Sequence, residues 1–321
     1  MRIVVIGDAM LDILRAGTSS RFSPECPACL IVNQEQVTHR PGGAANVAAW
    51  LAAVPGWTSL LHAHIGVSDR RNGAELIDAC SEADIQVLPH LTRAADTWQT
   101  TVKERIAVVS TERDEIHQIA RIDRDSNMVL LDMELERIAS DLERRAYGAI
   151  VCVDYGKGVF GGVAGCRLRE LVGSQALAGV PVFVNSKYPG DWQSHPIQAL
   201  ICNREEANRA WLDPMDVLTV LQSQTLVITM AEQGAGMWVS QGGGRWNQHV
   251  VPSHAQRVVD VTGAGDAFTA GFVYAAMQGH PIRWEVILEH ASWWAADCVR
   301  QVGVGRCRPG EIYGHQESVG F

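Results

Sequence analysis

Positive charge is scarce in this chain of 321 residues: 27 Lys and Arg face 36 Asp and Glu, for a formal net charge of −9 at pH 7. Without a basic stripe to displace counterions, a nucleic-acid partner is not expected. No hydrophobic run approaches the length of a membrane span. The N-terminus enters an apolar run, Arg2–Ile6, within a few residues, which leaves no room for a signal peptide. We therefore expect a cytoplasmic protein with no membrane partner.

The chain also lacks the cysteine pattern of a disulfide-stabilised protein. The eight cysteines are scattered, as reduced thiols are in cytosolic enzymes. Cys26 and Cys29 have metal-ligand spacing, but no second Cys/His pair follows at a plausible distance, so structural zinc is not expected. His62 and His64 lie in an apolar run where they would share one strand face, and we assign them no ligand role.

What the chain does have is an alternation of short Val/Ile-rich runs with longer Ala/Leu-rich stretches. This pattern predicts an α/β fold with a mainly parallel central sheet flanked by helices. No repeat or linker interrupts it, so residues 1–321 are expected to form a single domain, and 321 residues suffice for a full core. The candidate core strands are 2–6, 58–64, 149–153, 180–185, 199–202 and 225–229.

Two stretches, at about 13–40 and about 97–121, do not fit this alternation. They carry extended segments such as Cys29–Val32 and Val102–Val109. These segments are therefore expected to be extended and to lie outside the main alternation. Gly242–Gly244 is too short for an inter-domain linker and predicts the tip of a hairpin.

The run Asp260–Gly271 joins glycines to a carboxylate at the expected start of a helix, after a predicted strand end at Gln256–Asp260. Gly263 and Gly265 allow the backbone to present N–H groups to a phosphate, assisted by the helix N-terminus. Asp266 would repel a phosphate if it only lined the site. We therefore interpret it as a general base in phosphoryl transfer, with a simple helix N-cap as the alternative.

A second glycine pair, Gly42 and Gly43, opens another small-residue helix that carries Asn46 in its first turns. Together the two segments resemble the paired signatures of the ribokinase-like (PfkB) carbohydrate kinase family. The resemblance implies a ribokinase-like fold in which the stretches at about 13–40 and 97–121 form a β-sheet lid over the sugar. It also implies ATP and Mg²⁺ as co-substrate and cofactor, and a homodimer formed through the lid.

The resemblance further implies roles for individual residues. Asp266 would be the base, and the backbone N–H groups of Ala264 to Asp266 would form the anion hole. Gly263, Ala264 and Gly265 would belong to the catalytic segment that holds the phosphate. The residues that would bind the sugar are Asp12, Gly42, Gly43 and Asn46. Those that would bind the nucleotide are Thr229, Glu232, Gly234, Gly263 and Gly265. Asn203 and Glu206 would bind Mg²⁺ through water. Capping is the alternative role for Asp12 and Asn46, and an ordinary surface glutamate is the alternative for Glu206. A monovalent cation near Asp260 is left open.

Within the family, the likeness is to the heptose-7-phosphate kinases. It rests on the phrases Arg21–Glu25, Arg40–Ala48, Lys103–Arg105, Arg121–Asp123 and Asp154–Gly158. The substrate-binding cations that it implies are Arg21, Lys103, Arg105, Arg121 and Lys157. Cations at these positions would pair with a phosphate on the incoming sugar. The alternative is a solvated strand face.

The sequence also departs from these kinases. Ile13–Gly17 replaces an aromatic-rich segment of the sugar pocket, and Asn185–Lys187 reads Asn-Ser-Lys where Asp-Pro-Lys is expected. The expected reaction is Mg·ATP-dependent phosphorylation of heptose 7-phosphate at its anomeric hydroxyl. One alternative is kinase activity on another saccharide, such as a secondary metabolite or pseudo-oligosaccharide. Another is a non-catalytic sugar-phosphate sensor, which would have no need of Asp266 or of the Asn203…Glu206 pair.

Overall fold

A computed structural model describes residues 1–26, 28–66, 70–90, 99–110, 115–144, 146–211, 216–278 and 283–307. Its body is built on a nine-stranded sheet in the order β13-β12-β11-β10-β9-β8-β1-β4-β5, parallel except for β12 and β13. All six predicted core strands belong to it, which confirms the α/β prediction. The strands are β1 (Arg2–Gly7), β4 (Thr58–His64), β5 (Ile85–His90), β8 (Ala149–Asp154), β9 (Val182–Ser186), β10 (Ala199–Asn203), β11 (Thr225–Thr229), β12 (Ala235–Ser240) and β13 (Trp246–Val251).

Helices cover both faces of this sheet because its strands are apolar on both sides. In β1, Ile3 and Val5 pack into one core, and Val4 and Ile6 into the other. The first core is covered by α1 (Ala44–Ala52), α2 (Arg70–Glu82), α6 (Ala264–Ala276) and α7 (Trp284–Cys298). The second is covered by α3 (Asp132–Arg144), α4 (Gly162–Leu177), α5 (Arg204–Ala210) and the short 3₁₀ turns η1 (Pro189–Trp192) and η2 (Asp216–Thr219).

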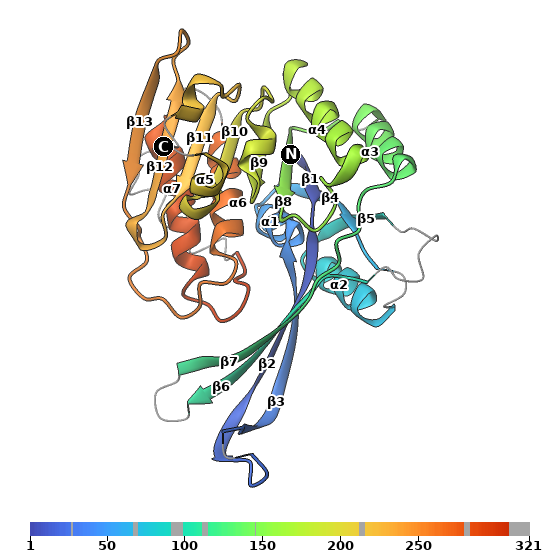
Figure 1. Cartoon of the computed structure of the whole chain (residues 1–321), viewed down its shortest axis with the longest axis vertical. Coiled ribbons are helices and arrows are strands. Elements are labelled where there is room, and N and C mark those ends of the chain that lie inside the picture. Colours follow the sequence, from blue (N-terminus) through green and yellow to red (C-terminus); the bar gives the residue numbers. More distant parts are fainter. Residues whose placement is uncertain are drawn as a thin grey trace.

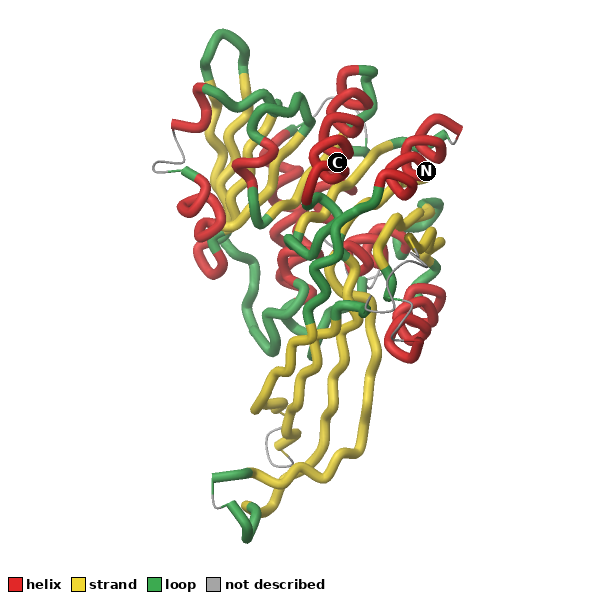
Figure 2. The backbone as a smooth tube through the Cα atoms, turned by 45° about the vertical axis from the view of Figure 1, so that its right-hand side comes forward, coloured by secondary structure: helices red, strands yellow, loops and turns green. Residues whose placement is uncertain are grey.

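A second sheet of four strands, in the order β3-β2-β6-β7, extends from the body as an arm (Figures 1 and 2). It consists of β2 (Ala9–Phe22), β3 (Leu30–Gly43), β6 (Val102–Ser110) and β7 (Glu115–Arg124). This is the lid that the irregular stretches predicted, although its strands begin before residue 13 and end after residue 121. Residues 97–98 and 111–114 of the predicted range lie outside the described residues.

The structure corrects one local prediction and confirms another. The strand end expected at Gln256–Asp260 is wrong: β13 ends at Val251, and the residues from there to Asp260 are irregular, with bends. Gly242–Gly244 does form the tip of the β12–β13 hairpin, with all three φ angles positive. Cys26 and Cys29 are free thiols whose sulfur atoms lie 2.6 Å apart. Within the described ranges, no helix is both long and apolar enough to cross a membrane.

Candidate active site

The start of α6 meets the start of α1 and the end of β8 around one buried carboxylate, that of Asp266. The Asn46 amide donates a 2.8 Å hydrogen bond to Asp266 Oδ2, and the Tyr155 hydroxyl donates a 2.7 Å bond to Oδ1. Asp266 lies in the first turn of α6, as predicted, and is 5% exposed. Two segments more than 200 residues apart in the sequence are thus joined by a single polar contact.

Burial raises the pKa of Asp266 to about 6, although the hydrogen bonds from Asn46 and Tyr155 act in the opposite direction. A carboxyl group with this pKa is ionised at neutral pH and still basic enough to accept a proton. The electrostatics therefore suit a general base better than a simple helix cap. The N-cap position of α6 is in fact Gly263, and no side chain caps the helix.

The glycines of this site serve different purposes. Gly43 (φ 59°) and Gly263 (φ 81°) adopt left-handed conformations, and a Cβ on Gly43 would lie 2.5 Å from the Asp8 carbonyl oxygen. A Cβ on Gly263 would lie 2.9 Å from the Asn46 amide nitrogen. Gly265, in contrast, faces open space, with no atom within 4 Å of a Cβ built there. Gly265 is also exposed, so the N-terminus of α6 reaches the surface of the protein at this position, where helix N–H groups favour an anion.

Asp12 lies at the base of the lid and forms a buried ion pair with Arg105. A Cβ on Gly42 would lie 3.6 Å from Asp12 Oδ2, so the glycine keeps the space beside the carboxylate free. Burial raises the pKa of Asp12, while Arg105 opposes that shift. The structure thus brings Asp12, Gly42, Gly43 and Asn46 to one region beside Asp266, as the sequence predicted.

Three further predicted cations gather at the lid base, but each has a carboxylate partner. Lys103 Nζ bonds Asp123 at 3.0 Å and also contacts Asp125. Arg121 chelates Asp123 through two hydrogen bonds of 2.7 and 3.1 Å, and Lys157 bonds Asp125 at 2.7 Å. The region is an ion-pair network rather than a set of unpaired cations.

Arg21 does not join this group. It is exposed near the far end of β2, roughly 30 Å along the strand from Asp12. In this structure Arg21 is therefore part of the distal lid.

On the other side of Asp266, Asn203 and Glu206 cap α5 reciprocally. Asn203 Oδ1 accepts the Glu206 N–H, and Glu206 Oε2 accepts the Asn203 N–H, both at 2.8 Å. This capping box is a structural role that needs no metal. Of the nucleotide-side residues, Thr229 ends β11 and Glu232 is exposed in η3 (Ala231–Gln233). Gly234 has φ 90°, and a Cβ there would lie 2.0 Å from the Val251 carbonyl oxygen.

No group of three or more His, Cys, Asp or Glu side chains among the described residues could hold a metal ion directly. The role of Asn203 and Glu206 in binding Mg²⁺ through water therefore stays a prediction. Asp260 is committed to the backbone: its two oxygens accept the N–H groups of Thr262 and Gly303, each at 2.9 Å. It fixes the turn that precedes α6.

Sequence reasoning missed three residues of this site. Tyr155 bonds Asp266, and the buried Asp8 accepts the N–H groups of Tyr155, Lys157 and Val159, which shapes the loop after β8. Lys187 lies with its Nζ 4.8 Å from the centre of the Tyr155 ring, and its pKa is lowered by burial and by neighbouring cations. Tyr155 lies within the segment Asp154–Gly158, in which the sequence analysis assigned a role only to Lys157.

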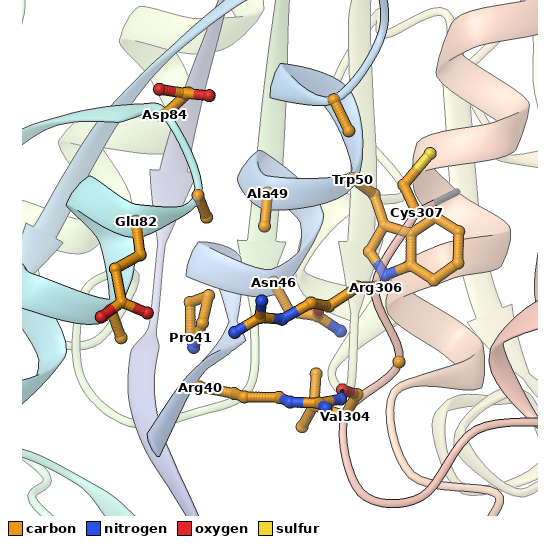
Figure 3. A pocket seen from close by; sticks show the side chains of 14 residues that line it. Arg40, Pro41, Asn46, Ala49, Trp50, Glu82, Asp84, Val304, Arg306 and Cys307 are labelled. Carbon is orange, nitrogen blue, oxygen red and sulfur yellow. Dashed lines mark hydrogen bonds between the residues drawn. The ribbon is translucent and has the colours of Figure 1, made fainter. Parts of the chain in front are cut away.

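A cavity of about 180 Å³ lies on the outer side of α1 and includes Asn46 in its lining. Figure 3 shows the Arg40 and Arg306 side chains beside Asn46 and Trp50. Arg40 donates to the carbonyl oxygens of Val302 and Val304, which ties the base of the lid to the segment after α7. The cavity thus lies behind the Asn46 amide that bonds Asp266.

Comparison with known proteins supports this description. The profile of the pfkB family carbohydrate kinases matches residues 159–310. The bifunctional protein HldE of Sodalis glossinidius is 32% identical over 97% of this chain, and that of Pectobacterium carotovorum is 31% identical over 97%. The chain spans 62% of the length of each of these two relatives.

Solved structures agree on the fold. Escherichia coli phosphofructokinase-2 in complex with substrates and products superposes with a TM-score of 0.71 at 15% identity, covering 99% of both chains. Arabidopsis thaliana ribokinase complexed with ribose and ATP gives 0.64 at 18% identity, covering 99% of this chain and 98% of the ribokinase. The solved structures therefore show a ribokinase-like fold, and the profile match and the two relatives show that the chain is similar to the pfkB family of carbohydrate kinases.

Proposed function

We propose that this protein transfers the γ-phosphoryl group of ATP to a hydroxyl group of a saccharide. The observation that carries the proposal is the buried Asp266 carboxylate, held by Asn46 and Tyr155 at the accessible N-terminus of α6. It combines a base with an anion site within one helical turn. Both are needed when a hydroxyl attacks a phosphoryl group.

The acceptor hydroxyl would lie beside Asp266, in the space that Gly42 leaves next to Asp12. Asp12 can accept hydrogen bonds from neighbouring sugar hydroxyls, because one carboxylate offers several acceptor sites. As the oxygen attacks, its proton passes to Asp266. Asn46 and Tyr155 keep the carboxylate oriented, and the backbone N–H groups of Ala264 to Asp266 stabilise the transferred group.

ATP and Mg²⁺ would lie between α6 and the α5 side of the sheet. Mg²⁺, when bound, would neutralise charge on the phosphates, with Asn203 and Glu206 acting through its water molecules. Lys187 is a further cation on this side, since its charge acts on both Asp266 and Glu206. A monovalent cation near Asp260 would bind backbone oxygens, because that carboxylate already accepts two N–H groups.

Two classes of acceptor are supported by different observations. The likeness to heptose-7-phosphate kinases favours heptose 7-phosphate, phosphorylated at the anomeric hydroxyl, with Lys103 and Arg121 near its phosphate. The ion pairs of these cations with Asp123 and Asp125 favour an unphosphorylated saccharide instead. A phosphate would have to displace carboxylates that already satisfy the lid cations.

The test is ADP release from ATP across a panel of sugars and sugar phosphates, with the phosphorylated position assigned by NMR. We expect at least one saccharide to give stoichiometric ADP and sugar phosphate. If sugar phosphates bound tightly but no ADP formed with any of them, the chain would instead be a sugar-phosphate sensor.

A further inference from the structure

A second cavity, of about 250 Å³, lies between the lid and the turn that precedes α6. Figure 1 shows the segment after β13 running down toward the lid strands. The lid contributes Leu14, Ala107, Ile116 and Gln118, and the body contributes Val258, Val259, Asp260, Val261 and Val302.

This cavity continues the face of the lid that carries the site. Alternate residues of a strand point to the same side, so Leu14 shares the face of Asp12. Across the sheet, Leu14 is in register with Arg105, and Ala107 lies two residues beyond it on the same face. The lid residues Leu14 and Ala107 of the cavity therefore follow directly after the Asp12–Arg105 ion pair on the same face of the sheet.

The chemistry changes along this face. Toward Asp266 it is charged, whereas seven of the nine residues that line the cavity are apolar. None of these lining residues is Lys or Arg, and the one charged side chain is the Asp260 carboxylate. A phosphate placed here would lose its hydration, find no cation and meet a negative charge. A neutral apolar group would lose nothing and would cover Val258, which is 57% exposed.

We propose that the cavity is a subsite for an apolar substituent of the acceptor saccharide, carried at the end remote from the phosphorylated hydroxyl. An apolar cavity of about 150 Å³ accommodates benzene, so 250 Å³ suffices for a short alkyl or aryl group. The inference rests on the proposed kinase function and narrows its acceptor to an unphosphorylated saccharide with one apolar end.

The experiment uses a set of aldoses, each in three forms at the terminal carbon: free hydroxyl, phosphate monoester and butyl ether. The KM for the butyl ether should be about 10- to 100-fold below that for the free hydroxyl, because several methylene groups leave water. The phosphate form should be the poorest acceptor of the three.

Two variants locate the effect. Val258→Asp should remove the preference for the butyl ether by raising its KM to that of the free-hydroxyl form. Val250→Asp, at a residue of β13 that is 60% exposed, is the matched control and should retain the preference. Both positions are exposed, so neither variant should unfold the protein.

The opposite outcomes are distinct. If all three forms reacted with equal KM, or the phosphate form reacted best, the subsite would be refuted while the kinase function stood. If Val258→Asp lowered kcat/KM equally for all forms, the apolar residues would serve lid closure and not substrate binding. If no form yielded ADP, the kinase function would fail, and calorimetry of the same panel would show whether the butyl ether still binds more tightly.

Discussion

Asp266 is the residue on which the proposed chemistry of this site depends. Its carboxylate is desolvated, which raises its pKa to about 6, and it remains ionised at neutral pH because Asn46 and Tyr155 donate hydrogen bonds to it. Since only the ionised form accepts a proton, kcat/KM should rise with pH through a midpoint at about 6 and level off above it. Below the midpoint, most of the base is protonated and inactive.

The variant Tyr155→Phe tests how far the hydrogen bond from Tyr155 offsets the effect of burial on the pKa of Asp266. The hydroxyl of Tyr155 lowers the pKa of Asp266, so its removal should raise that pKa further and move the acid limb of the kcat/KM profile upward by about one pH unit. Tyr147→Phe is the control, because the Tyr147 hydroxyl bonds Gln175 at a distance from the site. An acid limb that stayed in place in Tyr155→Phe would mean that another group titrates.

For single residues, the sequence predicted those that lie in known motifs, but it did not predict the side chains that form hydrogen bonds or ion pairs with them. Asp266 and Asn46 could be predicted because each follows a glycine turn at a helix start. Tyr155 and Asp8 could not, since their roles depend on how the loop after β8 folds against β1. Lys103 and Arg121 were predicted to bind a substrate phosphate, but the pairing of Lys103 with Asp123 becomes visible only in the register of β6 and β7.

At the scale of elements, Asn203 and Glu206 at the start of α5 have one observed role, in capping, and one proposed role, toward Mg²⁺. Asn203 and Glu206 cap it reciprocally, and they are also the residues we propose to act on Mg²⁺ through water. A cap contributes to folding whether or not a metal binds. Stability and activity must therefore be measured together.

Asn203→Ala should lower the free energy of unfolding by about 1 kcal/mol through loss of the cap, measured by urea denaturation. Glu206→Gln keeps an oxygen that can accept the Asn203 N–H, so its stability should match wild type. If Glu206 acts on Mg²⁺ through water, this variant should require a higher Mg²⁺ concentration for half-maximal rate. An unchanged Mg²⁺ dependence would leave Glu206 with its capping role alone.

The two sheets differed in how well their sequences predicted them. The six predicted body strands are mainly apolar, mostly buried segments of five to seven residues, and all six exist. The lid strands β2 and β3 are 14 residues long and mix exposed with buried positions, so their ends were misplaced. The strand expected at Gln256–Asp260 is absent because the Asp260 side chain binds backbone N–H groups and fixes a turn instead.

At the scale of the molecule, the lid exposes large apolar side chains, including Phe22 (60%) and Ile122 (43%). An extended sheet with two edges and exposed apolar residues favours association. We expect a homodimer formed through the lid at micromolar concentration.

Sedimentation velocity tests this, with Phe22→Asp expected to shift the protein toward monomer. Val163→Asp on α4, at a residue that is 78% exposed, is the control and should leave the assembly unchanged. A wild-type protein that sedimented as a monomer with and without substrate would refute the lid dimer.

The account as a whole depends on a base at the start of α6, and Asp266→Asn tests it most directly. The amide has the same shape, and loss of a buried charge removes a desolvation cost above pH 6, so the variant should unfold at a temperature no lower than wild type at pH 8. The measurement is kcat for ADP release with the best saccharide acceptor. We predict a decrease of about 10²- to 10⁴-fold with ATP binding retained. A kcat within a few-fold of wild type would contradict the proposal that Asp266 accepts the proton.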